Sequence, residues 1–272
     1  MSPTSTSEDT PPAGGASDNP PLPPAATKNA PPPRPWLGFT IDAALAVVLL
    51  MVVSILLITP LVLVETFASP GRPSDEVLQA MLPQITVAAI VSMLLAALAT
   101  WMLRGRNMVG ELPRSPLGPA LAWSLLAGVG IQLLVLAIDA GLGFLDAPLT
   151  PSNAEPIEAL ARQWPWLTWV LVVIVGPFAE ELLFRHVLLR RFALAGRVLA
   201  GLVATSALFA LLHEVGQGAD RSLAAWFGIL AVYLAMGMGF GLVYVRTGRL
   251  WAAFAAHAAC NATAMAIAAF ST

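Results

Sequence analysis

Long runs of apolar residues, separated by short polar segments, dominate the chain after residue 35. A helix that crosses a membrane needs about 20 consecutive, mostly apolar residues, and these runs are long enough to do so. They predict seven membrane-spanning helices, at residues 38–64, 83–103, 117–144, 166–190, 197–213, 222–245 and 250–270. The number rises to eight if the long third or fourth run breaks in two. The predicted fold class is all-α, a polytopic helical membrane protein.

The lysines and arginines between these runs predict how the helices are oriented. The N-terminal flank and the second, fourth and sixth loops hold ten of the 14 cations, and the other loops hold three. Cytoplasmic loops carry the excess of Lys and Arg, so the N-terminus is predicted to be cytoplasmic. Arginine supplies nearly all the cations, and Ala, Val and Leu fill the spans, as is typical of GC-rich bacterial genomes. We therefore expect an integral protein of the bacterial cytoplasmic membrane.

The first 35 residues differ in kind from the rest of the chain. They hold eleven of its 23 prolines, and Ser, Thr, Ala and Gly fill most of the other positions. Such a segment buries too little apolar surface to offset the entropy lost on ordering. Residues 1–35 are therefore predicted to be a disordered, proline-rich cytoplasmic tail.

Two carboxylates and an arginine lie close together inside the fourth predicted span, at Glu180, Glu181 and Arg185. An ionisable side chain at the bilayer centre costs at least about 2.5–3.5 kcal/mol, so such residues usually have a function. Residues four apart share a helix face, so Glu181 and Arg185 are expected to pair. A purely structural Glu–Arg pair would have the same spacing. Glu180 points elsewhere, has no local partner, and is left available for acid–base chemistry.

Two later spans add a histidine each. His213 lies four residues after Phe209, and His257 lies four residues before Asn261. A neutral imidazole can accept a proton, bind a metal or donate a hydrogen bond, and an asparagine can donate to a developing oxyanion. Together with Glu180 these groups suit the hydrolysis of an amide. Taken alone, His213 fits a hydrogen-bonded structural histidine at least as well.

Helix geometry places one condition on this arrangement. At a rise of about 1.5 Å per residue, Glu180 lies about 15 Å and His213 about 24 Å from the arginines predicted to be cytoplasmic. The fifth helix must therefore be tilted, or start deeper in the membrane, if the two side chains are to meet.

Three motifs lie in order on separate spans, namely E-E-x-x-x-R at residues 180–185, F-x-x-x-H at 209–213 and H-x-x-x-N at 257–261. This pattern resembles the CPBP family, which comprises CAAX proteases and bacteriocin-processing enzymes and is also called Abi. The resemblance implies an α-helical intramembrane endopeptidase. It covers the C-terminal part of the chain and implies a four-helix catalytic core in 165–272. The three N-terminal spans in 36–164 and the tail are not assigned by it.

The resemblance also implies roles for individual residues. Glu180 and His213 would activate the attacking water, while His257 and Asn261 would stabilise the oxyanion. Glu181 belongs to the same catalytic set, and Arg185 and Phe209 support it. The family has been described both as metalloproteases and as glutamic proteases. If a zinc ion is used, Glu180, His213 and His257 would bind it; we favour the metal-free mechanism, which requires no cofactor.

Two other classes of function compete with the protease. A carrier also buries charged residues, but it predicts internal repeats, and the two halves of the sequence show no convincing similarity. A catalytically silent scaffold, such as a bacteriocin-immunity protein, does not require the intact motifs found here. The expected partners are a peptide or membrane-protein substrate and the lipid bilayer, and the net charge of −2 gives no sign of nucleic-acid binding. Asp42 and Asp139, near span ends, are expected to be structural.

Overall fold

The computed structural model describes residues 34–144, 149, 151–214 and 222–270, which are mainly helical and include no strand. Six helical segments in this part of the chain are long and apolar enough to cross a membrane. They are Pro35–Ala68 (α1), Leu82–Gly105 (α3 and η1), Leu117–Gly143 (α4), Pro165–Leu194 (α6 to α8), Leu223–Thr247 (α10) and Leu250–Phe270 (α11). The predicted fold class, a polytopic helical membrane protein, is confirmed.

The fifth predicted span forms α9, Val198–Glu214, which at 17 residues is shorter than the other six. Every predicted apolar run therefore forms a helix. The long third run does not break, because α4 is continuous. The fourth run also continues without a break, as Pro165–Trp169 (α6), Val170–Val175 (η2), Gly176–Glu181 (α7), Leu182–Leu189 (η3) and Arg190–Leu194 (α8). The described residues thus provide no eighth span.

Three further short elements complete the described helices. Trp101–Gly105 (η1) follows Leu82–Thr100 (α3), and it is a π-helix, as are η2 and η3. Ser74–Ala80 (α2) and Ala154–Gln163 (α5) were not predicted, since neither is an apolar run. Of the predicted disordered tail, residues 1–33 lie outside the described residues, and α1 begins at Pro35.

Local sequence signals explain where several helices begin and end. Proline at the first helical position, as at Pro35 and Pro165, lacks only an N–H that would have no partner there. The Ser222 side chain caps α10 by accepting a hydrogen bond from the Ala225 N–H at 3.2 Å. Gly248 ends α10 with φ of 65°, and a Cβ there would collide with the Pro113 carbonyl. The tight turn from α10 to α11 therefore requires glycine.

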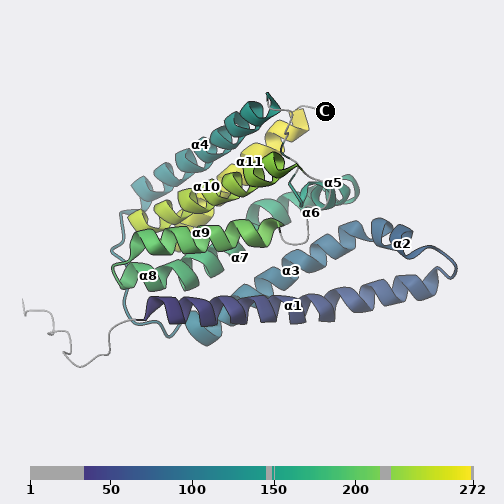
Figure 1. The fold of residues 1–272 in the computed structure, drawn as a ribbon, viewed down its shortest axis with the longest axis horizontal. Coiled ribbons are helices and arrows are strands. Elements are labelled where there is room, and N and C mark those ends of the chain that lie inside the picture. The colour runs from purple at the N-terminus through teal and green to yellow at the C-terminus, as the bar shows by residue number, and fades with distance from the viewer. Residues whose placement is uncertain (1–33, 145–148, 150, 215–221, 271–272) are drawn as a thin grey trace, which may run out of the picture. The chain divides into compact units, whose positions relative to one another are not determined.

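Helices from both parts of the chain pack together (Figure 1). α4 lies against α11 and α10, and α9 lies against α10. On the other side, α1 packs on α3, and α3 packs on α7. The predicted division into 36–164 and 165–272 stays a prediction, but the helices before residue 165 are in direct contact with those after it.

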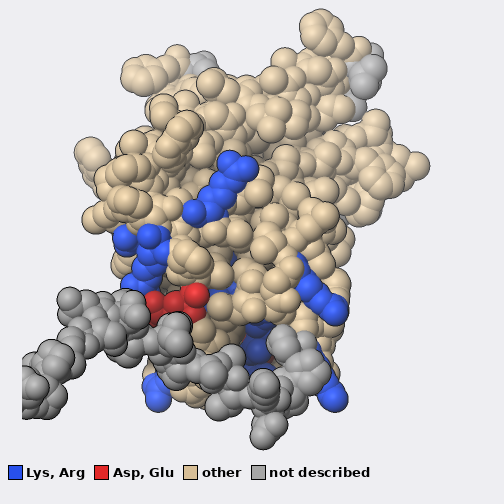
Figure 2. Space-filling model, turned by 90° about the vertical axis from the view of Figure 1, so that its left-hand side faces the viewer, with Lys and Arg blue, Asp and Glu red and all other residues tan. Residues whose placement is uncertain are grey.

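Arginine side chains gather at one end of these helices. This end is where η1, α8 and α10 finish and where α4 and α11 start, and it carries residues such as Arg104, Arg190 and Arg246. Figure 2 looks onto this face and shows several separate arginine or lysine side chains on it. We call it the arginine-rich end. Its position on the cytoplasmic side, as the charge distribution predicts, stays a prediction.

A buried carboxylate ties α1 to the rest of the protein at this end. Asp42 is fully buried, and its Oδ1 accepts a hydrogen bond of 2.7 Å from Arg104 Nε in η1. Its other oxygen, Oδ2, pairs with the Arg191 guanidinium in α8. The expected structural role of Asp42 is therefore to join three helices that are distant in sequence. Asp139 has a local role, because its Oδ1 accepts a hydrogen bond from the Leu149 N–H at 3.0 Å.

We expect Asp42→Asn to lower the free energy of unfolding by about 1.5–3 kcal/mol, because hydrogen bonds to a charged partner are lost and two arginines lose their counterion. Unfolding in detergent micelles, followed by circular dichroism, would measure this loss. Asp75→Asn, at an exposed position of α2, is the matched control. Equal stability of the two variants would contradict the assigned role of Asp42.

Candidate active site

The centre of the candidate site is a fully buried ion pair within the fourth span. Arg185 Nε donates to Glu181 Oε2 at 2.9 Å, and both side chains have no exposed surface. The other oxygen of the same carboxylate, Oε1, lies 3.0 Å from His257 Nδ1 in α11. The predicted Glu181–Arg185 pair is therefore present, and it also reaches the seventh span.

Glu180 points away from this pair and towards the two histidines. Its Oε1 lies 3.8 Å from His213 Nε2, and its Oε2 lies 3.7 Å from His257 Nε2. The fifth predicted helix, α9, therefore does bring His213 to Glu180, as the joint site requires. Both separations exceed a direct hydrogen bond and leave the carboxylate able to share a water with either ring. The Glu180 side chain is 12% exposed whereas that of Glu181 is 0% exposed, so the first glutamate has open space beside it and the second has none.

Each imidazole is held through its Nδ1 atom. His213 Nδ1 lies 2.9 Å from the Phe209 carbonyl oxygen, which can only accept, so Nδ1 carries the proton. His257 Nδ1 likewise donates to the Glu181 carboxylate, which Arg185 keeps as an acceptor. In their neutral forms both rings therefore direct the Nε2 lone pair towards Glu180. The two contacts set the same tautomer on two different helices.

Aromatic rings fix the planes of these imidazoles. Phe240 in α10 stacks on His257, with ring centroids 4.3 Å apart and planes inclined by 16°. His213 contacts both Phe209 and Tyr233, at centroid distances of 4.2 Å and 4.4 Å. Phe209, predicted as a supporting residue, also lies 5.6 Å from the Arg185 guanidinium carbon. Tyr233 and Phe240 lie outside the motifs, and nothing in the sequence separates them from other apolar residues of α10.

Asn261 makes a contact that its predicted role does not include. Its Nδ2 donates to the Val172 carbonyl oxygen at 2.9 Å. Val172 lies in the π-helical segment η2, where the Gly176 N–H bonds to the Leu171 carbonyl. The next residue is Pro177, which has no N–H to offer to the Val172 carbonyl. The Asn261 amide therefore replaces a missing backbone donor, and its second N–H is left for other partners.

A cavity of about 340 Å³ lies beside Glu180 and Asn261. Its walls come from the N-terminal half of α3, the start of α5, and η2, and they are mostly apolar. Among the described residues that line it, Glu180 is the single ionisable side chain. The Ser152 hydroxyl, before α5, donates to the His213 carbonyl oxygen at 2.5 Å, which holds this segment against the end of α9. The cavity could accept an uncharged, apolar chain next to the candidate base.

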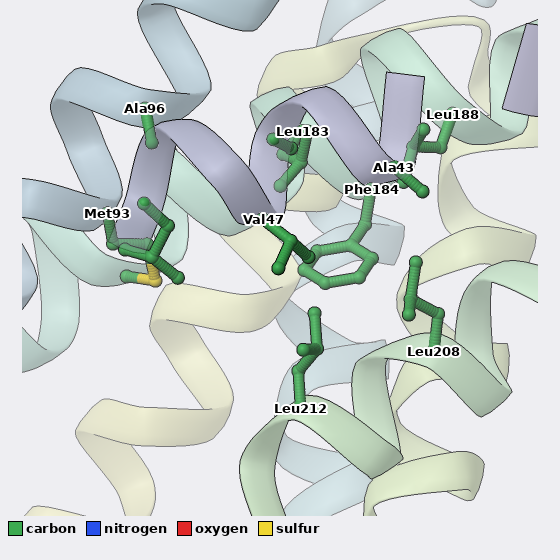
Figure 3. A pocket seen from close by; sticks show the side chains of 11 residues that line it. Ala43, Val47, Met93, Ala96, Leu183, Phe184, Leu188, Leu208 and Leu212 are labelled. Atoms are coloured by element: carbon green, nitrogen blue, oxygen red, sulfur yellow. The ribbon is translucent and has the colours of Figure 1, made fainter. Parts of the chain in front are cut away.

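A second, smaller cavity lies beside the Phe184 ring. It measures about 30 Å³ and is enclosed by apolar side chains of α1, α3, η3 and α9. Figure 3 shows the Phe184 ring surrounded by Val47, Leu208 and Leu212. Phe184 in turn meets Phe209 edge to face at 5.2 Å. This cavity offers no polar group and belongs to the packing behind the candidate site.

The predicted zinc ligands do not converge as metal ligands do. The two Nε2 atoms face different oxygens of Glu180, and among the described residues no three His, Cys, Asp or Glu side chains form a metal-binding group. The rings do have the Nδ1 contacts that metal-bound histidines usually make. The metal-free mechanism, like the alternative set of zinc ligands, stays a prediction.

The chain is similar to known membrane peptidases. Residues 162–263 match the family model of type II CAAX prenyl endopeptidases, Rce1-like. The predicted membrane peptidase YdiL of Bacillus subtilis is 25% identical over 216 residues, which cover 78% of this chain and 82% of YdiL. The membrane-embedded CAAX protease MroQ of Staphylococcus aureus is 33% identical over 138 residues, which cover 48% of this chain and 51% of MroQ. No solved structure matches the chain significantly.

The contact between Asn261 and Val172 can be tested with a double-mutant cycle. We expect Asn261→Ala to cost about 0.5–1.5 kcal/mol of stability, because the part-buried Val172 carbonyl loses its donor. In a Pro177→Ala background an N–H becomes available to that carbonyl, so the same change should cost at least about 0.5 kcal/mol less. Denaturation of the four proteins in detergent gives the coupling energy. An equal cost in both backgrounds would contradict the replacement of a backbone donor by Asn261.

Proposed function

We propose that this chain, which belongs to the CPBP family of CAAX-protease-like membrane peptidases, hydrolyses a peptide bond placed beside Glu180. One observation carries the proposal. A partly accessible carboxylate lies between two imidazole Nε2 atoms at 3.8 and 3.7 Å, next to a mostly apolar cavity. A water bound there would contact a base on one side and the substrate carbonyl on the other.

In the first step, the Glu180 carboxylate removes a proton from this water, and the oxygen attacks the carbonyl carbon of the peptide. His213 assists by accepting a hydrogen bond from the water at Nε2, since its Nδ1 proton is engaged by the Phe209 carbonyl. The carbonyl π bond opens and gives a tetrahedral oxyanion. Glu180 then passes its proton to the amide nitrogen, the C–N bond breaks, and an amine and a carboxylic acid result.

The oxyanion needs hydrogen-bond donors, and two residues can supply them. The second N–H of the Asn261 amide is one, with the amide already anchored on Val172. His257 is the other when it carries a proton on Nε2, and the Glu181 carboxylate at its Nδ1 stabilises that cationic form. Arg185 holds Glu181 in place, so it acts on the reaction as a positioning residue.

The substrate and the membrane orientation form part of the proposal. The mostly apolar lining of the cavity beside Glu180 favours a peptide or membrane-protein segment with uncharged side chains around the cleaved bond. Because this cavity involves the half of α3 that is distant from the arginine-rich end, its mouth would face away from the cytoplasm if that end is cytoplasmic.

Glu180→Gln keeps the shape of the side chain but removes the base, so the rate of peptide cleavage should fall at least about 100-fold. Purified protein in detergent, assayed on a library of apolar peptides, would measure the effect. Glu76→Gln, at an exposed position of α2, is the control and should keep full activity. Equal cleavage by wild type and Glu180→Gln would exclude Glu180 as the base. A wild type with no activity on any peptide would instead favour the scaffold.

The metal-free mechanism makes a separate prediction. Treatment with EDTA and 1,10-phenanthroline, followed by gel filtration, should leave cleavage within about twofold of the untreated protein, because no step uses a metal-bound water. Elemental analysis of the same sample should find far less than one zinc per chain. Stoichiometric zinc, with activity lost on chelation and restored by zinc, would establish the metalloprotease mechanism instead.

A further inference from the structure

A second large hollow lies on the opposite side of the helix bundle from the cavity beside Glu180. It has a volume of about 740 Å³ and runs between α4 and α10, which lie side by side in Figure 1. This volume falls within the usual range of ligand sites, about 300–1,000 Å³. We call it the α4–α10 groove, and the residues that matter here are Trp123, Gly130, Leu134, Gly239, Leu242 and Arg246.

Small residues create the groove, and apolar side chains at its edge face outwards. A Cβ added at Gly130 would meet no other atom within 4 Å, so the space beside it is open. Trp123 is 71% exposed and Leu134 is 50% exposed, although both lie within a membrane-spanning helix. The groove therefore opens sideways to the hydrocarbon of the bilayer. Lipid acyl chains surround the protein there and can fill it.

One end of the groove carries a positive charge. Arg246 lines it and lies in the last turn of α10, at the arginine-rich end. Its side chain is exposed, and in the described ranges no carboxylate forms an ion pair with it. Nearby Arg114 is paired with Glu111 at 3.1 Å and is thus partly neutralised. An apolar slot that ends in an unpaired arginine at membrane-surface depth complements a lipid with an anionic headgroup.

We propose that the α4–α10 groove binds one acyl chain of an anionic phospholipid, whose phosphate-containing headgroup contacts Arg246. The site is independent of the proposed proteolysis, because none of its lining residues lines the cavity beside Glu180. It nevertheless adjoins the active-site support. Gly239 in the groove precedes Phe240, the ring that stacks on His257. Lipid in the groove would therefore pack against the helix that positions this ring.

Native mass spectrometry of the detergent-solubilised full chain can test the site. The protein would be titrated with phosphatidylglycerol and with phosphatidylcholine of the same acyl chains, and the first bound lipid would be quantified. A single arginine near the membrane surface should give roughly a fivefold preference for phosphatidylglycerol. No preference in the wild type would overturn the proposed headgroup contact.

Two variants test separately the contribution of the α4–α10 groove and that of the arginine charge. Gly130→Leu places a side chain in the open space of the groove without strain in the helix. It should weaken the binding of the first phosphatidylglycerol at least about fivefold. Gly141→Leu is the matched control, since it is also an open glycine of α4 but does not line the groove. Arg246→Gln should keep lipid binding but bind both lipids equally. Unchanged binding in Gly130→Leu, with thermal unfolding in detergent like that of Gly141→Leu, would overturn the proposal.

Discussion

The Glu181 carboxylate is the group on which the rest of the candidate site depends. Inside a membrane protein a charge is tolerable when it is paired and hydrogen-bonded, and each oxygen of Glu181 has its own partner. Arg185 takes Oε2 and His257 takes Oε1, so one buried group links the fourth span to the seventh. The same contacts leave the neighbouring Glu180 free of the pair. Glu181 thus holds two helices together, while the Glu180 carboxylate lies outside this pair and faces Nε2 of both histidines.

The contacts of the two histidines likewise hold one part of each ring and leave another part free. Backbone and carboxylate oxygens determine which nitrogen carries the proton, while Phe209, Tyr233 and Phe240 determine the plane of each ring. Neither kind of contact uses Nε2. The two Nε2 atoms therefore stay available for other partners, although both imidazoles are held by several contacts. Such preorganisation costs no rearrangement when charge develops in a reaction.

Much of the fold could be predicted from the sequence, because apolar runs long enough to span a bilayer have few alternatives to a helix. The Glu181–Arg185 pair could be predicted for a similar reason, since its partners are four residues apart. Contacts that depend on tertiary packing could not. The His257 partner lies 76 residues away, and the Asn261 contact arises from a π-helical turn followed by proline, which a regular helical period does not anticipate. The catalytic roles of Glu180, His213, His257 and Asn261 stay predictions, although the fold brings all four to one place.

The contact of Asp42 has a consequence for how the protein is made. The most apolar window of α1 has none of its residues buried against the other helices, so this span can enter the membrane without them. The Asp42 carboxylate in this helix pairs with Arg104 and also with Arg191, which is 149 residues away. During synthesis α1 is made before the other described helices, and its bond to Arg191 can form only after the fourth span has emerged from the ribosome. A contact of α1 is thus completed only after two other spans, α3 and α4, have been made.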